Sequence, residues 1–213
     1  MGARSIRYTL DGTLPTIDSP LYTSAISVNQ TAVVKAIAIH KAKLPSVAST
    51  AFFSKSLPIQ RVQYLSPPAQ RRSGSSGENT LIDLVRATAE VGDRAWQGFD
   101  KNDLDVILDL GQLRDLEEIM LSCLENSGTR AFLPASIEIS VSGDDKEYRT
   151  LATQNLTVSE KAEPASAKNL NYRLANVQAR YIHVKAKNIG TVPTWHANAG
   201  ANAWMYFDEI IVR

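Results

Sequence analysis

Acidic residues are the first side chains here that could catalyse a reaction, because two carboxylates facing each other across a pocket can hydrolyse a glycosidic bond. Such a pair must lie roughly 5–10 Å apart. Asp208 and Glu209 are adjacent in a predicted strand, where consecutive side chains point to opposite faces. Asp144-Asp145 falls in a predicted hairpin turn, and residues 100–105 place their acids around a surface turn. We therefore predict no catalytic residue and no enzyme activity in this chain.

Motifs for other chemistries are missing from the sequence. It contains no His-x-x-x-His, cysteine cluster, Gly-x-Ser-x-Gly or phosphate-binding glycine loop. Its one cysteine, Cys123, excludes an internal disulfide. The formal net charge of +1 gives no basic field for nucleic acid, and no apolar run approaches the roughly 20 residues of a membrane span. We expect neither nucleic acid nor a membrane span.

Aromatic and planar polar residues gather in three predicted loops, and this mixture suits a sugar ligand. The C–H face of a sugar stacks on an aromatic ring, while paired donors and acceptors bridge neighbouring hydroxyls. Alternatives stay open, since Trp96 could be a structural plug, Arg130 could form a surface salt bridge and Trp195 could pack. The predicted ligand-binding residues are Trp96, Gln97, Asn126, Arg130, Phe132, Trp195 and His196.

The elements that must position these loops are predicted to be strands. The run LDVILDLG at 104–111 alternates between an apolar face and a mostly acidic one before a closing glycine. Residues 113–125 fit a helix or a strand, and we choose a strand because Gly111 closes the one before it. A hairpin is predicted over 136–151, and 203–213 forms the closing strand. Many short strands and no convincing helix predict an all-β sandwich.

The sequence IRYTLDGTLPTIDSPLYTSAISVNQTAVVKAIAIHKAKLPS resembles the small β-sandwich of the chitobiase/hexosaminidase C-terminal family. The YTLDG turn, the Pro-Thr after it, the Ser-Pro-Leu-Tyr step and the Ile-x-Val and V-K-A-x-A strands carry this resemblance. It covers about residues 4–54 and implies a first domain over residues 1–57. The family pattern has another strand or two upstream of the YTLDG turn, so we expect this sandwich to be truncated.

Residues 58–213 resemble the discoidin, or coagulation-factor-five/eight type C, family. The motifs are WQGF-x-x-x-DL, NSGTRAFLP, ARYIHVKAKNIG and TWHANAGANAW-x-x-x-DEI. The resemblance implies a jelly-roll β-sandwich that binds ligands with loops at one end. It is similar to the family 32 carbohydrate-binding domain that ends some bacterial family 20 glycoside hydrolases. The order of the two domains strengthens the resemblance.

The discoidin resemblance also implies a structural cation, often calcium. In that family an Asp-Gly pair, a Thr a few residues on and a Glu near the C-terminus enclose the ion with backbone carbonyls. Asp83, Thr88 and Glu209 match this pattern and offer the hard oxygen donors that Ca²⁺ prefers. Leu84 stands where glycine is usual, in a turn that could need a positive φ. The alternative is that Asp83 caps a turn and Glu209 makes a hydrogen bond.

Together the resemblances imply a non-catalytic accessory region of a glycoside hydrolase, a β-N-acetylhexosaminidase, that is periplasmic or extracellular. The expected partners are a glycan with a galactose- or N-acetylhexosamine-type terminus and the catalytic domain of the parent enzyme. We expect a monomer, and the N-terminus has no signal-peptide pattern. The alternatives are a purely structural packing region and a protein-adhesion module.

Overall fold

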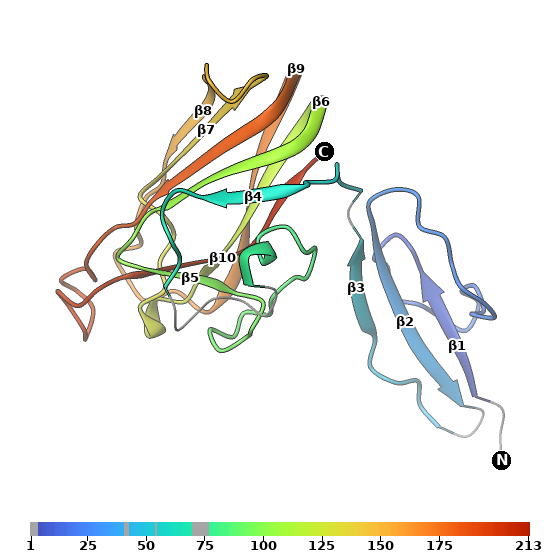
Figure 1. The fold of residues 1–213 in the computed structure, drawn as a ribbon. Coiled ribbons are helices and arrows are strands. Elements are labelled where there is room, and N and C mark those ends of the chain that lie inside the picture. The colour runs from blue at the N-terminus through green and yellow to red at the C-terminus, as the bar shows by residue number, and fades with distance from the viewer. Residues whose placement is uncertain (1–3, 41–42, 54, 70–76) are drawn as a thin grey trace. The chain divides into compact units, whose positions relative to one another are not determined.

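The computed structural model describes residues 4–40, 43–53, 55–69 and 77–213 and divides the chain into two compact units. The first is Met1–Ser56 and the second is Leu57–Arg213, where the sequence predicted a boundary between residues 57 and 58. Figure 1 shows strands and loops in both units, and the predicted all-β fold class is confirmed. Among the described residues, no helix has the length and apolar character needed to cross a membrane.

The first unit contains a three-stranded antiparallel sheet. Its strands are β1 (Arg4–Thr9), β2 (Ala32–His40) and β3 (Ser49–Phe53), with β2 in the centre. The YTLDG motif forms a turn after β1, where Gly12 has a φ of +80°. The Asp11 carboxylate accepts hydrogen bonds from the backbone N–H and the hydroxyl of Thr13 at 3.0 and 2.6 Å. The turn is therefore held by its own side chains.

The second unit is a larger β structure whose strands pair in the order β5-β10-β6-β9-β7-β8. β4 lies outside this order and also pairs with β6. The elements are β4 (Arg61–Tyr64), η2 (Gly77–Asn79), β5 (Gln97–Asp100), β6 (Leu104–Glu125), η3 (Ser127–Thr129), β7 (Ser136–Ser142), β8 (Arg149–Asn155), β9 (Ser166–Lys187) and β10 (Trp204–Val212).

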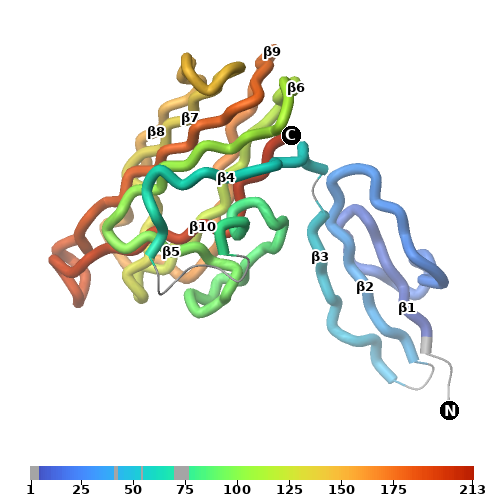
Figure 2. The backbone as a smooth tube through the Cα atoms, in the orientation of Figure 1, coloured from blue at the N-terminus to red at the C-terminus, as the bar shows by residue number. Residues whose placement is uncertain are grey.

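The two 22-residue strands β6 and β9 serve both layers of this sandwich. The first half of β6 pairs with β4 and with the second half of β9, which also pairs with β7. The second half of β6 pairs with β10 and with the first half of β9. Figure 2 follows both strands along their length. The two layers are therefore joined by shared strands.

The strand predicted for residues 113–125 is confirmed, but it does not start anew after Gly111. Gly111 lies inside β6 with a φ of +78°, and the pairing with β9 changes register between Asp109 and Arg114. Such an irregularity lets a strand bend sharply without ending. Gly111, which the sequence pattern marks as a strand terminator, is instead part of the bend that carries β6 from one layer to the other.

The core of the second unit lies between its layers. Leu104, Val106, Leu108 and Leu110 are all buried, as their alternation predicts. The rings of Phe99 on β5 and Phe207 on β10 meet edge to face with centroids 6.2 Å apart. Cys123 packs into the same core as a small apolar side chain, and burial raises its thiol pKa to about 12.

Replacing Gly111 with alanine should destabilise the protein by about 1–2 kcal/mol, because a Cβ is unfavourable at positive φ. The new Cβ would also stand 2.3 Å from the side chain of Gln60, which would have to move. Urea unfolding followed by tryptophan fluorescence measures the change. Gly143→Ala is the matched control, since an added Cβ there meets nothing within 4 Å. Equal stabilities of the two variants would contradict the role of the bend.

Candidate functional site

Two loops that carry predicted ligand-binding residues meet at one end of the second unit. The loop between β6 and β7 supplies Phe132, and the loop between β9 and β10 supplies Trp195 and His196. The ring centroid of Phe132 lies 6.3 Å from that of Trp195 and 6.2 Å from that of His196, edge to face in both cases. The Nε2 atom of His196 is 2.8 Å from the carbonyl oxygen of Ser127. The two loops are thus in direct contact.

A third loop, between β8 and β9, completes this end of the unit. The indole N–H of Trp195 donates to the carbonyl oxygen of Ser159 at 3.0 Å. The backbone N–H of Glu163 donates to the hydroxyl of Ser127 at 2.8 Å, and the Glu163 carboxylate lies 3.0 Å from the hydroxyl of Ser159. Val158 packs with Phe132 in a small apolar cluster. The polar, poorly patterned sequence of this loop predicted no such role, and Val158 is its main apolar signal.

Three of the predicted ligand-binding residues present groups at this surface. The Trp195 side chain is 36% exposed. Arg130 is half-buried in a left-handed conformation with a φ of +65°, and its guanidinium makes no hydrogen bond or ion pair within the described residues. Asn126 caps η3 without a side-chain hydrogen bond, so its amide is also available. The geometry offers one aromatic face and two unused planar polar groups on neighbouring loops.

Three other candidates are buried, which corrects the prediction for Trp96, Gln97 and Phe132. Trp96 is 1% exposed, and its indole N–H donates to the carbonyl of Thr88 at 3.0 Å. Gln97 begins β5 and is fully buried. Phe132 is buried beneath Trp195 and His196. None of the three offers an exposed surface to a ligand, and of the three only Phe132 packs against Trp195 and His196.

Asn188 fixes the base of the β9–β10 loop. Its side-chain amide donates to the carbonyl oxygens of Phe99, Asn102 and Ala203 at 3.2–3.4 Å, and its own oxygen accepts from the N–H of Gly190. The backbone N–H of Asn188 donates to the Asp103 carboxylate at 2.7 Å. One buried side chain therefore joins both ends of the loop to the β5–β6 turn, and the sequence analysis missed it.

Acidic side chains also meet at a buried corner where residues 81–87 cross β10. Asp208 is the extra residue where the pairing of β10 with β6 shifts between Phe207 and Glu209. Asp208 and Glu209 are both fully buried, so neither carboxylate faces an accessible cleft. The Arg86 guanidinium pairs with Asp208 at 3.0 Å, and the Ala87 N–H donates to the same oxygen at 2.8 Å. Asp208 is therefore committed to a structural ion pair.

The same corner contains carboxylate oxygens without donors. One oxygen of Asp83, one of Asp208 and both of Glu209 are buried with no hydrogen-bond partner. Burial, and then the neighbouring carboxylate of Asp83, raise the pKa of Glu209 to about 9. Leu84 has a φ of +62°, the left-handed conformation in which glycine would carry no strain. Thr88 is engaged elsewhere, since its hydroxyl and N–H both donate to Asp93.

Asp83 and Glu209 thus fit the predicted cation ligands, while the Thr88 side chain does not. Within the described residues, no three acidic, histidine or cysteine side chains converge as a metal-binding group. A hard cation here would be held by Asp83 and Glu209 together with backbone carbonyls. It would supply the positive charge that these buried oxygens lack.

Comparison with known proteins matches only the first unit to a family. Residues 1–50 match the model of the chitobiase/beta-hexosaminidase C-terminal domain. A search of curated proteins found no match.

Several solved structures are similar to about three-quarters of the chain. The Clostridium perfringens protein CpGH89CBM32-5, solved with GalNAc-β-1,3-galactose, shares 17% identity over 74% of this chain and 99% of its own, with a TM-score of 0.47. A Streptococcus pneumoniae fucose binding module shares 13% identity over 75% and 97%, with a TM-score of 0.46. The C-terminal domain of a Bacteroides fragilis chitobiase shares 17% over 75% and 97%, with a TM-score of 0.41. At these values the similarities decide neither ligand nor site.

Replacing Arg86 with methionine should destabilise the second unit by about 3 kcal/mol, because the buried Asp208 carboxylate loses its counter-charge. Urea unfolding in the presence of a chelator measures this loss without any contribution from bound cations. Lys185→Met is the control, since Lys185 and Glu138 form a pair 3.7 Å apart in which the side chains are 48% and 42% exposed. That pair should contribute less than about 1 kcal/mol. Similar losses of unfolding free energy in both variants would contradict a larger contribution from the buried Arg86–Asp208 pair.

Proposed function

We propose that this chain is a non-catalytic carbohydrate-binding accessory region of a secreted glycoside hydrolase, and that the second unit binds a glycan terminus with its loop end. The observation that carries the proposal is the exposed ring of Trp195, which packs against the β6–β7 loop that also carries Arg130 and Asn126, two planar polar side chains with no hydrogen-bond partner among the described residues. A sugar can stack its C–H face on the indole while Arg130 and Asn126 bridge its hydroxyls.

The geometry of the loops favours such a ligand. Trp195 is held by its indole N–H and by the Phe132 ring, so its position is set before a ligand arrives. A preordered aromatic platform loses little conformational entropy on binding. One ring face and two planar polar side chains suit the end of a glycan better than a long chain.

The first unit supports the identity of the parent enzyme. Its match to the chitobiase/beta-hexosaminidase C-terminal domain and the discoidin-like motifs of the second unit together favour a β-N-acetylhexosaminidase. A galactose- or N-acetylhexosamine-type terminus is the proposed ligand, and the periplasm or the extracellular space is the proposed location. Binding to a glycan surface would raise the local substrate concentration for a tethered catalytic domain.

A structural cation is part of the same proposal. Among the described residues, four buried carboxylate oxygens of Asp83, Asp208 and Glu209 lack a hydrogen-bond donor, and Arg86 is the only cation that pairs at this corner. Calcium held by Asp83, Glu209 and backbone carbonyls would neutralise this excess and fix residues 81–87 on β10. The cation would stabilise the fold and take no part in chemistry.

A purely structural role is the second candidate, and the surface of the first unit favours it. Among its described residues, Pro15, Ala32 and Ile37 are the only buried apolar side chains. Leu14, Ile17 and Val47 are each at least 67% exposed. A unit with so small a core gains stability by covering this surface. The catalytic domain of the parent enzyme is the proposed cover.

Trp195→Ala tests the glycan proposal. Loss of the stacking face should weaken binding to a galactose- or N-acetylglucosamine-terminated glycan by at least about 30-fold, as for other central aromatic contacts. Glycan-array screening followed by calorimetry measures this change. Phe52→Ala is the control because Phe52 is an exposed aromatic in the first unit. A wild-type protein that melts normally but binds no glycan would favour the structural role.

Calcium should raise the melting temperature of the wild-type protein after chelation. At a calcium concentration of 100 times the dissociation constant, linkage gives a gain of about 2.7 kcal/mol. Asp83→Asn should remove this response, whereas Glu160→Gln, an exposed acid on the β8–β9 loop, should leave it intact. Differential scanning calorimetry supplies the measurement. A wild-type melt that calcium does not move would refute the cation site.

A further inference from the structure

The hydrogen bonds of His196 allow only one protonation state. Its Nε2 atom is 2.8 Å from the carbonyl oxygen of Ser127, and a carbonyl only accepts, so Nε2 carries a proton. Its Nδ1 atom is 2.9 Å from the backbone nitrogen of Asn198, which only donates, so Nδ1 keeps its lone pair. The neutral ring with hydrogen on Nε2 satisfies both bonds. Imidazolium and the other tautomer do not.

These two bonds leave His196 with no ring nitrogen for a ligand. The residue types in the sequence placed His196 among the ligand-binding groups, but the structure uses both nitrogens for backbone atoms. The ring also packs against Phe132 on one loop and against Trp195, its chain neighbour, with the latter centroid 5.4 Å away. His196 therefore lies between the β6–β7 and β9–β10 loops and beside the proposed sugar platform.

We infer that His196 is a positioning residue whose two ring hydrogen bonds, the His196 latch, hold Trp195 in place and make the site sensitive to pH. The inference rests on the proposed glycan site. Protonation of Nδ1 would turn its lone pair into an N–H aimed at the N–H of Asn198. That bond would be lost and replaced by repulsion between two donors, and the β9–β10 loop would loosen.

The loops that surround His196 carry four charged residues besides the ring itself. Arg130 is the charged residue of the β6–β7 loop. Glu160, Lys161 and Glu163 lie on the β8–β9 loop, and the Glu163 carboxylate is already bonded to Ser159. The β9–β10 loop itself, over residues 188–203, contains no other charged side chain. The donor clash at Asn198 is therefore the main consequence of adding a proton.

The latch can be tested without a ligand. Long-range ¹H–¹⁵N spectra report the tautomer of each of the three histidines, His40, His183 and His196. At pH 7.5 we expect the His196 ring to be neutral with hydrogen on Nε2. On lowering the pH to 5.0, its protonation should coincide with faster hydrogen exchange across residues 191–203. A ring with hydrogen on Nδ1, or protonation without any change in the loop, would overturn the inference.

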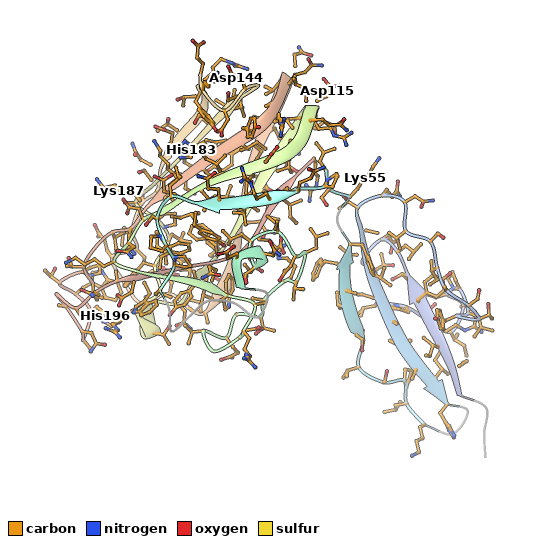
Figure 3. All side chains as sticks on the ribbon, viewed as in Figure 1. Lys55, Asp115, Asp144, His183, Lys187 and His196 are labelled. Carbon is orange, nitrogen blue, oxygen red and sulfur yellow. The ribbon has the colours of Figure 1, made fainter. Side chains whose placement is uncertain are left out.

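Binding gives the second test, with galactose and N-acetylglucosamine as probes in calorimetry at constant calcium. The wild-type dissociation constant should rise at least about tenfold between pH 7.5 and 5.0, the interval in which histidines titrate. His196→Gln keeps a donor and an acceptor but cannot titrate, so its affinity should vary little with pH. His183→Gln is the matched control, because His183 pairs with Asp105 on the β6–β9 sheet, away from the loop of His196 (Figure 3).

The outcomes separate the two proposals. A protein that binds neither sugar at pH 7.5 contradicts the proposed function, while the spectra still decide the state of His196. Affinity that falls equally with pH in wild type and His196→Gln shows that another group titrates and overturns the latch. Loss of the pH dependence in His183→Gln would also overturn the latch, because His183 would then be the group that titrates. Thermal melts at both pH values confirm that each variant is folded during the measurement.

Discussion

The pairing of β6 with β9 is the constraint on which the second unit depends. Each strand is 22 residues long, and their ladder runs through both layers from Leu104 to Glu125. In a β-ladder successive side chains point to opposite faces, so one pair of strands fixes which residues face inward in both layers. β4, β7 and β10 add to this pair. β6 ends at the β6–β7 loop and β9 at the β9–β10 loop, and these loops meet where Phe132 packs against Trp195 and His196.

The loop end is ordered by polar contacts and a small apolar cluster. Ser127 joins all three loops, because its hydroxyl bonds with Glu163 and its carbonyl accepts from His196. Asn188 secures the base of the last loop on three carbonyl oxygens. Backbone groups outside a ladder need such partners when they are buried. Order of this kind costs nothing further when a ligand binds, so it favours recognition by a shallow surface.

Periodicity predicted the strands well and their bends poorly. Alternation between Leu104 and Leu110 identified a buried face because a half-buried strand has period two. Gly111 carried the usual signal of a strand end, yet the ladder with β9 continues after a register shift. Local sequence does not encode that long-range pairing. The prediction that Trp96 binds ligand was wrong for a related reason, since residue type alone does not show whether an aromatic side chain faces solvent or the core. The positive φ of Leu84 followed from family resemblance, because no local pattern indicates it.

The distinction between ligand contacts and supporting residues comes from asking which polar groups are already used. The indole N–H of Trp195 and both ring nitrogens of His196 are bonded to the protein, so only the ring face of Trp195 remains. In the proposed site, the guanidinium of Arg130 and the amide of Asn126 would supply the remaining donors and acceptors. Such a set gives one stacking contact and a few hydrogen bonds, which limits the affinity of a single site. Attachment to a catalytic domain would then provide the effective concentration that the site alone does not.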